Sequence, residues 1–111
     1  MSNLFRSLVF VPGNNSRFLE KAKSLPADIV CFDLEDSVPD KEKKKARVLI
    51  KNTLKQRNKY SPDVFVRTNS PESGLVEADL KEIVQKGIDG IIIPKVNSAK
   101  NLRKLKKQSH L

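Results

Sequence analysis

The sequence predicts an α/β fold in which parallel strands are covered by helices. Short runs of continuous apolar residues alternate with segments whose apolar residues recur at helical spacing, and this alternation occurs four times in 111 residues. Strands that are apolar throughout, rather than at every second position, are typical of parallel sheets buried on both faces. The chain is 38% hydrophobic and 32% charged, which is ordinary for globular material, so we expect one domain over residues 1–111.

The first two strand and helix pairs lie before residue 55. The run SLVFV at residues 7–11 predicts a strand, and after a short turn a helix is expected at about residues 16–23. The run IVCFDL at residues 29–34 predicts the second strand. Asp40 is a candidate N-cap for the second helix. One face of this helix is expected to carry Ala46, Leu49, Ile50, Thr53 and Leu54, which fall at i, i+3, i+4, i+7 and i+8.

The last two pairs follow the same pattern. The run DVFVRTN at residues 63–69 predicts the third strand. A helix with an apolar face from Val76 to Val84 should follow it and end near Gly87. The run GIIIPK at residues 90–95 predicts the fourth strand, and a basic helix is expected after it.

The spacing of the strands favours a barrel. They begin near residues 7, 29, 63 and 90, so each unit averages about 30 residues, which suits a (β/α)8 TIM barrel of roughly 250 residues. We therefore expect a truncated N-terminal half, (βα)4, with Val66, Ile91 and Ile93 facing the barrel interior. A small doubly wound, flavodoxin-like domain is the alternative, although that fold usually has five strands.

The net charge of +9, from 22 basic and 13 acidic residues, favours an anionic partner. Much of the excess lies in two predicted helical stretches, KEKKKAR at residues 41–47 and KNLRKLKK at residues 100–107, which we interpret as solvated basic faces. Nucleic acid is not the expected partner, because the chain has one Tyr and no Trp with which to stack bases. A basic module that binds nucleic acid or an acidic protein stays open as an alternative function.

The sequence contains no apolar run of the roughly 20 residues that a membrane-spanning helix needs. The N-terminal residues also lack the pattern of a signal peptide. We therefore expect a cytoplasmic protein with no membrane partner. Cys31, the only cysteine, lies in an apolar run and is predicted to be a packing residue.

Polar residues stand at the end of each predicted strand, where parallel α/β folds place their functional sites. They fall at residues 12–14, 33–36, 67–69 and 95–97. Side chains alternate along a strand, so Asp33 and Glu35 should share one face of the second strand, and Arg67 and Asn69 one face of the third. The acidic and basic side chains should therefore meet at one rim of the fold, where the strands end. Two interpretations remain open from the residues alone: a functional site, or a salt-bridge network in which Asp36 makes the turn.

Four of these segments together resemble a known family. The stretches RSLVFVPGNN, FDLEDSV, VRTNSPESGLVEADL and IIIPKVNSA are similar to the N-terminal half of the citrate lyase beta-chain and malyl-CoA lyase family, within the HpcH/HpaI aldolase superfamily. The resemblance covers nearly all of the chain. It is specific because the four motifs occur in the right order, each at the end of its strand.

The resemblance implies a TIM-barrel enzyme that uses Mg²⁺ to cleave or form a carbon–carbon bond in a 3-hydroxy acyl-CoA thioester. Malyl-CoA, citramalyl-CoA or citryl-CoA would give acetyl-CoA or acetate and a 2-oxo acid. It also implies that the full-length protein is a homo-oligomer. Residues 1–111 alone are expected to be inactive, because in the family the Glu and Asp that bind Mg²⁺ directly lie on strands beyond Leu111.

Site residues follow from the resemblance position by position. Arg67 matches the catalytic arginine that holds the substrate and stabilises the developing negative charge. Phe10, Arg17 and Lys21 match positions that contact the CoA substrate. An outer shell that would bind metal waters and orient the basic residues comprises Asp33, Glu35, Asp36 and Lys95.

A receiver-like signalling domain is the remaining alternative. Acidic residues at a strand end, with Lys95 at another, are a combination found in phospho-acceptor domains. However, Arg67 stands where the central strand of such a domain would carry the phospho-acceptor Asp.

Overall fold

The computed structural model describes residues 7–84 and 87–94. Strands (β), α-helices (α) and short 3₁₀ helices (η) follow one another along the chain. In order they are β1 (Leu8–Pro12), α1 (Ser16–Lys21), η1 (Ala22–Ser24), β2 (Ile29–Asp33), η2 (Asp40–Glu42), α2 (Lys43–Leu54), η3 (Arg57–Lys59), β3 (Asp63–Arg67), η4 (Pro71–Ser73), α3 (Val76–Ile83) and β4 (Gly90–Ile92).

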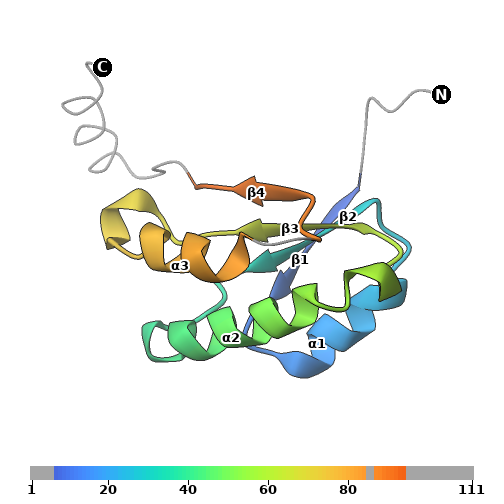
Figure 1. Cartoon of the computed structure of the whole chain (residues 1–111), viewed down its shortest axis with the longest axis horizontal. Coiled ribbons are helices and arrows are strands. Elements are labelled where there is room, and N and C mark those ends of the chain that lie inside the picture. The colour runs from blue at the N-terminus through green and yellow to red at the C-terminus, as the bar shows by residue number, and fades with distance from the viewer. Residues whose placement is uncertain (1–6, 85–86, 95–111) are drawn as a thin grey trace, which may run out of the picture.

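The four strands form one parallel sheet in the order β1-β2-β3-β4. The three α-helices lie together on one side of this sheet (Figure 1). Each strand therefore connects to its parallel neighbour through a segment on the same face, which is the arrangement of consecutive units in a (β/α)8 barrel. The predicted α/β fold is confirmed.

The core lies between the sheet and the helices. Alternate residues of β2 and β3 point into it, including Phe32 of β2 and Val66 of β3, which are fully buried. The ring of Phe32 meets that of Tyr60 edge to face at 5.7 Å, and the Tyr60 hydroxyl donates to the carbonyl of Leu19. The helices contribute Leu19, Ala46, Ile50, Leu54 and Ile83. Apolar burial of this kind stabilises the layer by roughly 25 cal/mol per Å².

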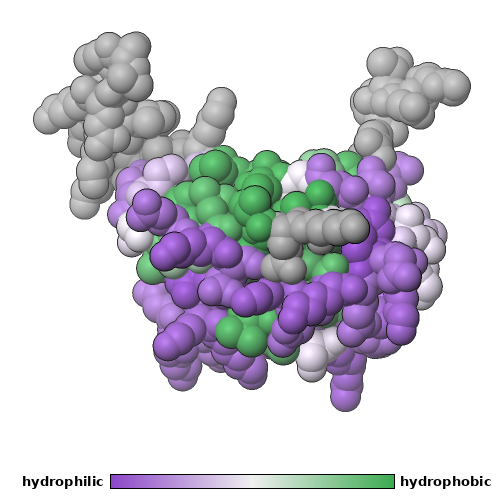
Figure 2. Space-filling view, viewed as in Figure 1, coloured by the Kyte–Doolittle hydropathy of each residue, from purple (hydrophilic) through white to green (hydrophobic). Residues whose placement is uncertain are grey.

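The opposite face of the sheet carries no helix among the described residues. Phe10, Cys31 and Phe65 form one row across it, because they are register partners on neighbouring strands. Cys31 is fully buried, as predicted, whereas the Phe10 side chain is 47% exposed. At Gly90 a Cβ atom would lie 2.6 Å from the Phe65 ring, so only glycine lets this ring cross to β4. In Figure 2 apolar atoms gather in the upper half of the view, above a polar lower half.

The predicted interior face was wrong for Val66 and Ile91. Val66 packs against the helices, and its register partner Ile91 shares that face, where Ile91 is partly exposed because β4 is an edge strand. Arg67 and Ile92, one residue further along their strands, occupy the face away from the helices.

Several predicted boundaries also shift. The third and fourth strands end at Arg67 and Ile92, earlier than expected, and the first helix ends at Lys21 before a 3₁₀ turn. Asp40 is not the N-cap of α2, because it begins η2 and Glu42 occupies the cap position. The predicted fourth helix lies outside the described residues. In the described part of the chain, no helix has the length and apolar character required to cross a membrane.

Candidate functional site

Asp33 and Arg67 end two neighbouring strands and are register partners. The Arg67 guanidinium donates two hydrogen bonds to the Asp33 carboxylate, from Nε to Oδ1 at 2.8 Å and from a terminal nitrogen to Oδ2 at 2.9 Å. This two-point contact fixes the plane of the guanidinium as well as its position. The acid and base predicted to meet at one rim are therefore in direct contact.

Asp33 also shapes the loop that follows β2. Its carboxylate accepts hydrogen bonds from the backbone N–H groups of Glu35 and Ser37 and from the Ser37 hydroxyl. Burial by itself would raise the pKa of Asp33, but the hydrogen bonds from Arg67 and from this loop outweigh it and lower the pKa to about 2. Asp33 is thus a fixed anion that holds the arginine on one side and the loop on the other.

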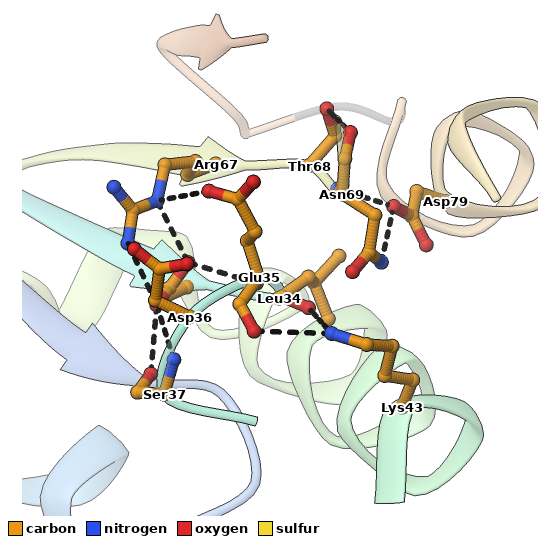
Figure 3. A network of polar contacts seen from close by, with 10 residues as sticks. Leu34, Glu35, Asp36, Ser37, Lys43, Arg67, Thr68, Asn69 and Asp79 are labelled. Carbon is orange, nitrogen blue, oxygen red and sulfur yellow. Dashed lines mark hydrogen bonds and ion pairs between the residues drawn. The ribbon is translucent and has the colours of Figure 1, made fainter. Parts of the chain in front are cut away.

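Glu35 and Asp36 add negative charge around the same guanidinium, as Figure 3 shows. Each has a carboxylate oxygen 3.7 Å from an Arg67 nitrogen. Burial, followed by the charge of Asp36, raises the pKa of Glu35, while Arg67 opposes that shift. The pKa of Arg67 is raised by its hydrogen bonds to Asp33 and by the surrounding carboxylates, despite partial burial. Arg67 therefore stays charged at any pH at which the protein is folded.

Phe10 covers the guanidinium from β1. Its ring centroid lies 4.4 Å from Cζ of Arg67, which is cation–π distance. The chain just after β1 lies close to the end of β2, where the Gly13 N–H donates to the Asp33 carbonyl. A Cβ at Gly13 would lie 2.6 Å from that oxygen, so the absence of a side chain permits this approach. A cavity of about 280 Å³ opens beside the pair, lined by Phe10, Pro12, Asp33, Asp36, Ser37 and Arg67.

A second hollow of about 250 Å³ lies along the edge of β1 and against α1. It is lined by apolar side chains and one lysine: Val9, Phe10, Val11, Pro12, Phe18, Lys21 and Leu25. Phe10 and Pro12 border both hollows, of which one is lined by Arg67 and the other by Lys21. Arg17 is exposed on α1 and lines neither hollow. The structure thus groups Phe10 with both Arg67 and Lys21, but it does not bring Arg17 to either.

A buried lysine, which the sequence pattern did not predict, lies beside the acidic loop. Lys43 lies in the run interpreted as a solvated basic face, but its side chain is only 7% exposed, so that interpretation was wrong for this position. Its ammonium donates to the carbonyls of Leu34 and Glu35 at 2.8 and 3.0 Å. The one signal available was helical phase, because Lys43, Ala46 and Ile50 fall on the same face.

A second missed cluster fixes the end of β3. The fully buried Asp79 of α3 accepts from the backbone and side-chain nitrogens of Asn69, each at 2.8 Å. Its other oxygen accepts from Nε of Arg47 on α2 at 2.8 Å. Three elements are therefore tied together two residues beyond Arg67. Arg47 too belongs to the run that was expected to be solvated.

The described residues do not form a direct metal site. Within residues 7–84 and 87–94, no group of three or more His, Cys, Asp and Glu side chains is arranged to hold a metal ion. Both oxygens of Asp33 are already used by Arg67 and the loop. Lys95, expected in the outer shell, lies outside the described residues.

Comparison with known proteins gives a consistent result. Residues 6–110 match the HpcH/HpaI aldolase/citrate lyase family. The chain is 42% identical over 98 residues to a (3S)-malyl-CoA thioesterase of Cereibacter sphaeroides, covering 88% of this chain and 34% of that protein. It is 38% identical over 102 residues to citrate lyase subunit beta of Leuconostoc mesenteroides, covering 92% and 34%. It is 34% identical over 100 residues to the mitochondrial citramalyl-CoA lyase of Rattus norvegicus, covering 88% and 30%.

The fold also matches a solved structure. Malate synthase of Haloferax volcanii, in a lead(II) complex, superposes with a TM-score of 0.72 at 18% identity, covering 96% of this chain and 36% of that one. This match supports the half-barrel architecture. The chain spans about a third of the length of the curated relatives it matches.

Proposed function

Because this chain belongs to the HpcH/HpaI aldolase/citrate lyase family, we propose that the protein carrying it is a lyase that acts on a 3-hydroxy acyl-CoA thioester. Relatives are named for malyl-CoA, citramalyl-CoA and citrate, which are compounds of this chemical class or its free acid. The proposed reaction gives acetyl-CoA or acetate and a 2-oxo acid. A cytoplasmic location and a homo-oligomeric state are part of the proposal. The family match leaves no support for the receiver-like and nucleic-acid alternatives.

The observation that carries this proposal is the oriented guanidinium of Arg67. Within the described part of the chain, Asp33 accepts from two of the five N–H donors of this guanidinium, which leaves three for other acceptors. The cavity on that side is small and bordered by the Phe10 ring, so a substrate there would displace water from the charge. Hydrogen bonds to a fixed cation in such a place favour an oxygen on which negative charge develops.

The proposed cleavage of the carbon–carbon bond needs a fixed cation of this kind. Cleavage removes the proton of the 3-hydroxyl, breaks the bond between C2 and C3 of the acyl chain, and leaves the electron pair of that bond on the thioester part as an enolate. Protonation at C2 completes the acetyl product, and the former hydroxyl carbon becomes the carbonyl of the 2-oxo acid. We assign Arg67 the task of binding the substrate and stabilising the oxyanion in this step.

The positions of Phe10 and Lys21 indicate where the CoA part of the thioester would bind. The hollow along β1 is apolar apart from Lys21, which suits a pantetheine chain with a phosphate near its end. In this proposal Phe10 separates the reacting end from the CoA tail, and Lys21 and Arg17 contact the CoA moiety through their charges. Arg17 is the weaker assignment, because it rests on the sequence match without a neighbouring hollow.

Enzymes of this family generally use a divalent metal, and we propose Mg²⁺. The described residues do not supply its direct ligands, so the ion would be held by residues elsewhere in a longer protein. It would supply positive charge to the 2-oxo acid part of the substrate. Asp33, Glu35, Asp36 and Lys95 are proposed as the outer shell.

The proposal is tested with a protein that contains this chain and matches its relatives in length. It should convert malyl-CoA or citramalyl-CoA to acetyl-CoA and a 2-oxo acid when Mg²⁺ is present. Separate measurement of acetyl-CoA and of free CoA distinguishes carbon–carbon cleavage from thioester hydrolysis. Release of free CoA alone, or no turnover of either thioester, would contradict the lyase assignment.

A further inference from the structure

The loop between β2 and η2 is held from two sides. On one side the Asp33 carboxylate accepts from the N–H groups of Glu35 and Ser37. On the other side the Lys43 ammonium donates to the carbonyls of Leu34 and Glu35. Figure 3 shows Lys43 reaching this backbone from α2, opposite the Arg67 side of the loop.

The position of Lys43 is unfavourable for a cation unless its contacts with the loop compensate. Lys43 is the first residue of α2, where the helix dipole repels positive charge, and it is largely removed from water. Among the described residues, no carboxylate lies within ion-pairing distance of its ammonium group. Its hydrogen bonds go instead to two carbonyls of the segment that carries Glu35 and Asp36.

Lys43 also supplies positive charge where carboxylates outnumber cations. Asp33, Glu35 and Asp36 surround one guanidinium, and the second cation that acts on Glu35 is Lys43. The neighbouring lysines Lys44 and Lys45 are exposed on the same helix and cannot replace it. Burial, position and contacts therefore distinguish this lysine from the rest of the basic run.

We propose that Lys43 is a positioning residue, which holds the loop from Leu34 to Ser37 so that its carboxylates stay arranged around Arg67. Lys43 does not touch the cavity beside Arg67, so it would act through the loop and not on a ligand. Its structural part can be tested without a measurement of activity. Its consequence for turnover rests on the proposed lyase function.

The first experiment measures hydrogen exchange of backbone amides in a protein that contains this chain and matches its relatives in length, and in its K43M variant. Loss of two hydrogen bonds from a charged group should speed exchange at Glu35 and Ser37 by about tenfold or more. The Val64 amide, which donates to Asp89 at the other end of the sheet, should change by less than about twofold. K44M removes the same charge from an exposed neighbour and should leave all three amides unchanged.

Each contrary outcome has a definite meaning. An equal rise at Val64 would show that Lys43 stabilises the whole domain and positions nothing, and an equal effect of K44M would show that only net charge matters. Unchanged exchange at Glu35 and Ser37 in K43M would also overturn the proposal.

The second experiment compares kcat and KM of K43M with those of R67K in a lyase that carries this chain. Mispositioned carboxylates should lower kcat by about tenfold and change KM by less than about threefold. If the unaltered protein cleaves no thioester, the proposed function fails, and if R67K leaves turnover intact, the role assigned to Arg67 fails. If R67K lowers turnover and K43M does not, the function stands and the positioning role fails.

Discussion

The carboxylate of Asp33 and the guanidinium of Arg67 form a two-point ion pair between in-register residues of adjacent parallel strands. A pair built on two strands is held more rigidly than one built on loops, because the strand backbones cannot move independently. Phe10 packs on the face of the guanidinium from β1, on the other side of β2. The free N–H groups of Arg67 therefore have a direction that the sheet itself determines.

Replacement of Arg67 by lysine should lower turnover much more than it weakens thioester binding. Lysine keeps the charge but loses the planar fork that Asp33 orients, and the loss of one such donor typically costs roughly 100-fold in kcat. Steady-state kinetics in a lyase that carries this chain, with CoA affinity measured separately, provide the test. Arg57→Lys is the matched control, because Arg57 pairs with Asp89 at the opposite end of the sheet. Near-normal turnover of Arg67→Lys would refute the assignment.

Neutralisation of Arg17 and Lys21 together should weaken binding of the CoA thioester and of free CoA by about tenfold or more, because phosphate contacts are mainly ionic. Affinity for a small 2-oxo acid should not change. Calorimetry at low and high salt measures both quantities. A double replacement of Lys44 and Lys45 by Gln removes the same charge from exposed positions and should have little effect. Equal losses of CoA affinity in the two double variants would show that Arg17 and Lys21 act only through general surface charge.

Much of this site could be predicted from sequence, because polar residues at the ends of apolar strands must collect at one edge of a parallel sheet. That rule brought Asp33 and Arg67 together correctly. It could not determine which face Val66 occupies, since a continuously apolar strand shows no contrast between its two sides. Lys43 and Asp79 were missed for a different reason. Their burial depends on contacts between segments that are far apart in the chain, and a charge run looks the same whether its members are solvated or buried.

Asp33 should make stability depend on pH in the acid range. Its pKa of about 2 in the folded protein lies below its ordinary value of 3.8, so between these values the unfolded chain binds more protons and stability rises with pH. The contribution is complete above about pH 4, where it amounts to about 2 kcal/mol, and it is lost as the pH falls toward 2. Denaturant unfolding of Asp33→Asn from pH 2 to 6 should show a flatter profile. A slope as steep as that of the unaltered chain would mean that other carboxylates account for it.

Asp79→Ala should destabilise the domain by about 3 kcal/mol, because it leaves the buried Asn69 donors without an acceptor and the Arg47 charge unpaired. Denaturant unfolding at neutral pH measures the change. Glu77→Ala alters an exposed acid on the same helix and should cost less than about 0.5 kcal/mol. Similar losses in both variants would show that helix propensity or net charge, and not the buried cluster, is responsible.

Residues 1–111 produced alone should self-associate, bind Mg²⁺ weakly and fail to cleave malyl-CoA or citramalyl-CoA. The face of the sheet away from the helices exposes Phe10, and β1 and β4 are edges of the described sheet that another chain could extend. Light scattering should therefore give a mass above the 12.5 kDa of one chain. Phe10→Ser should reduce association, whereas Val48→Ser, at an equally exposed apolar position on α2, should not. A sharply melting monomer that turned over either thioester would show that the open sheet needs no partner, and that the residues bound to the metal lie within this chain.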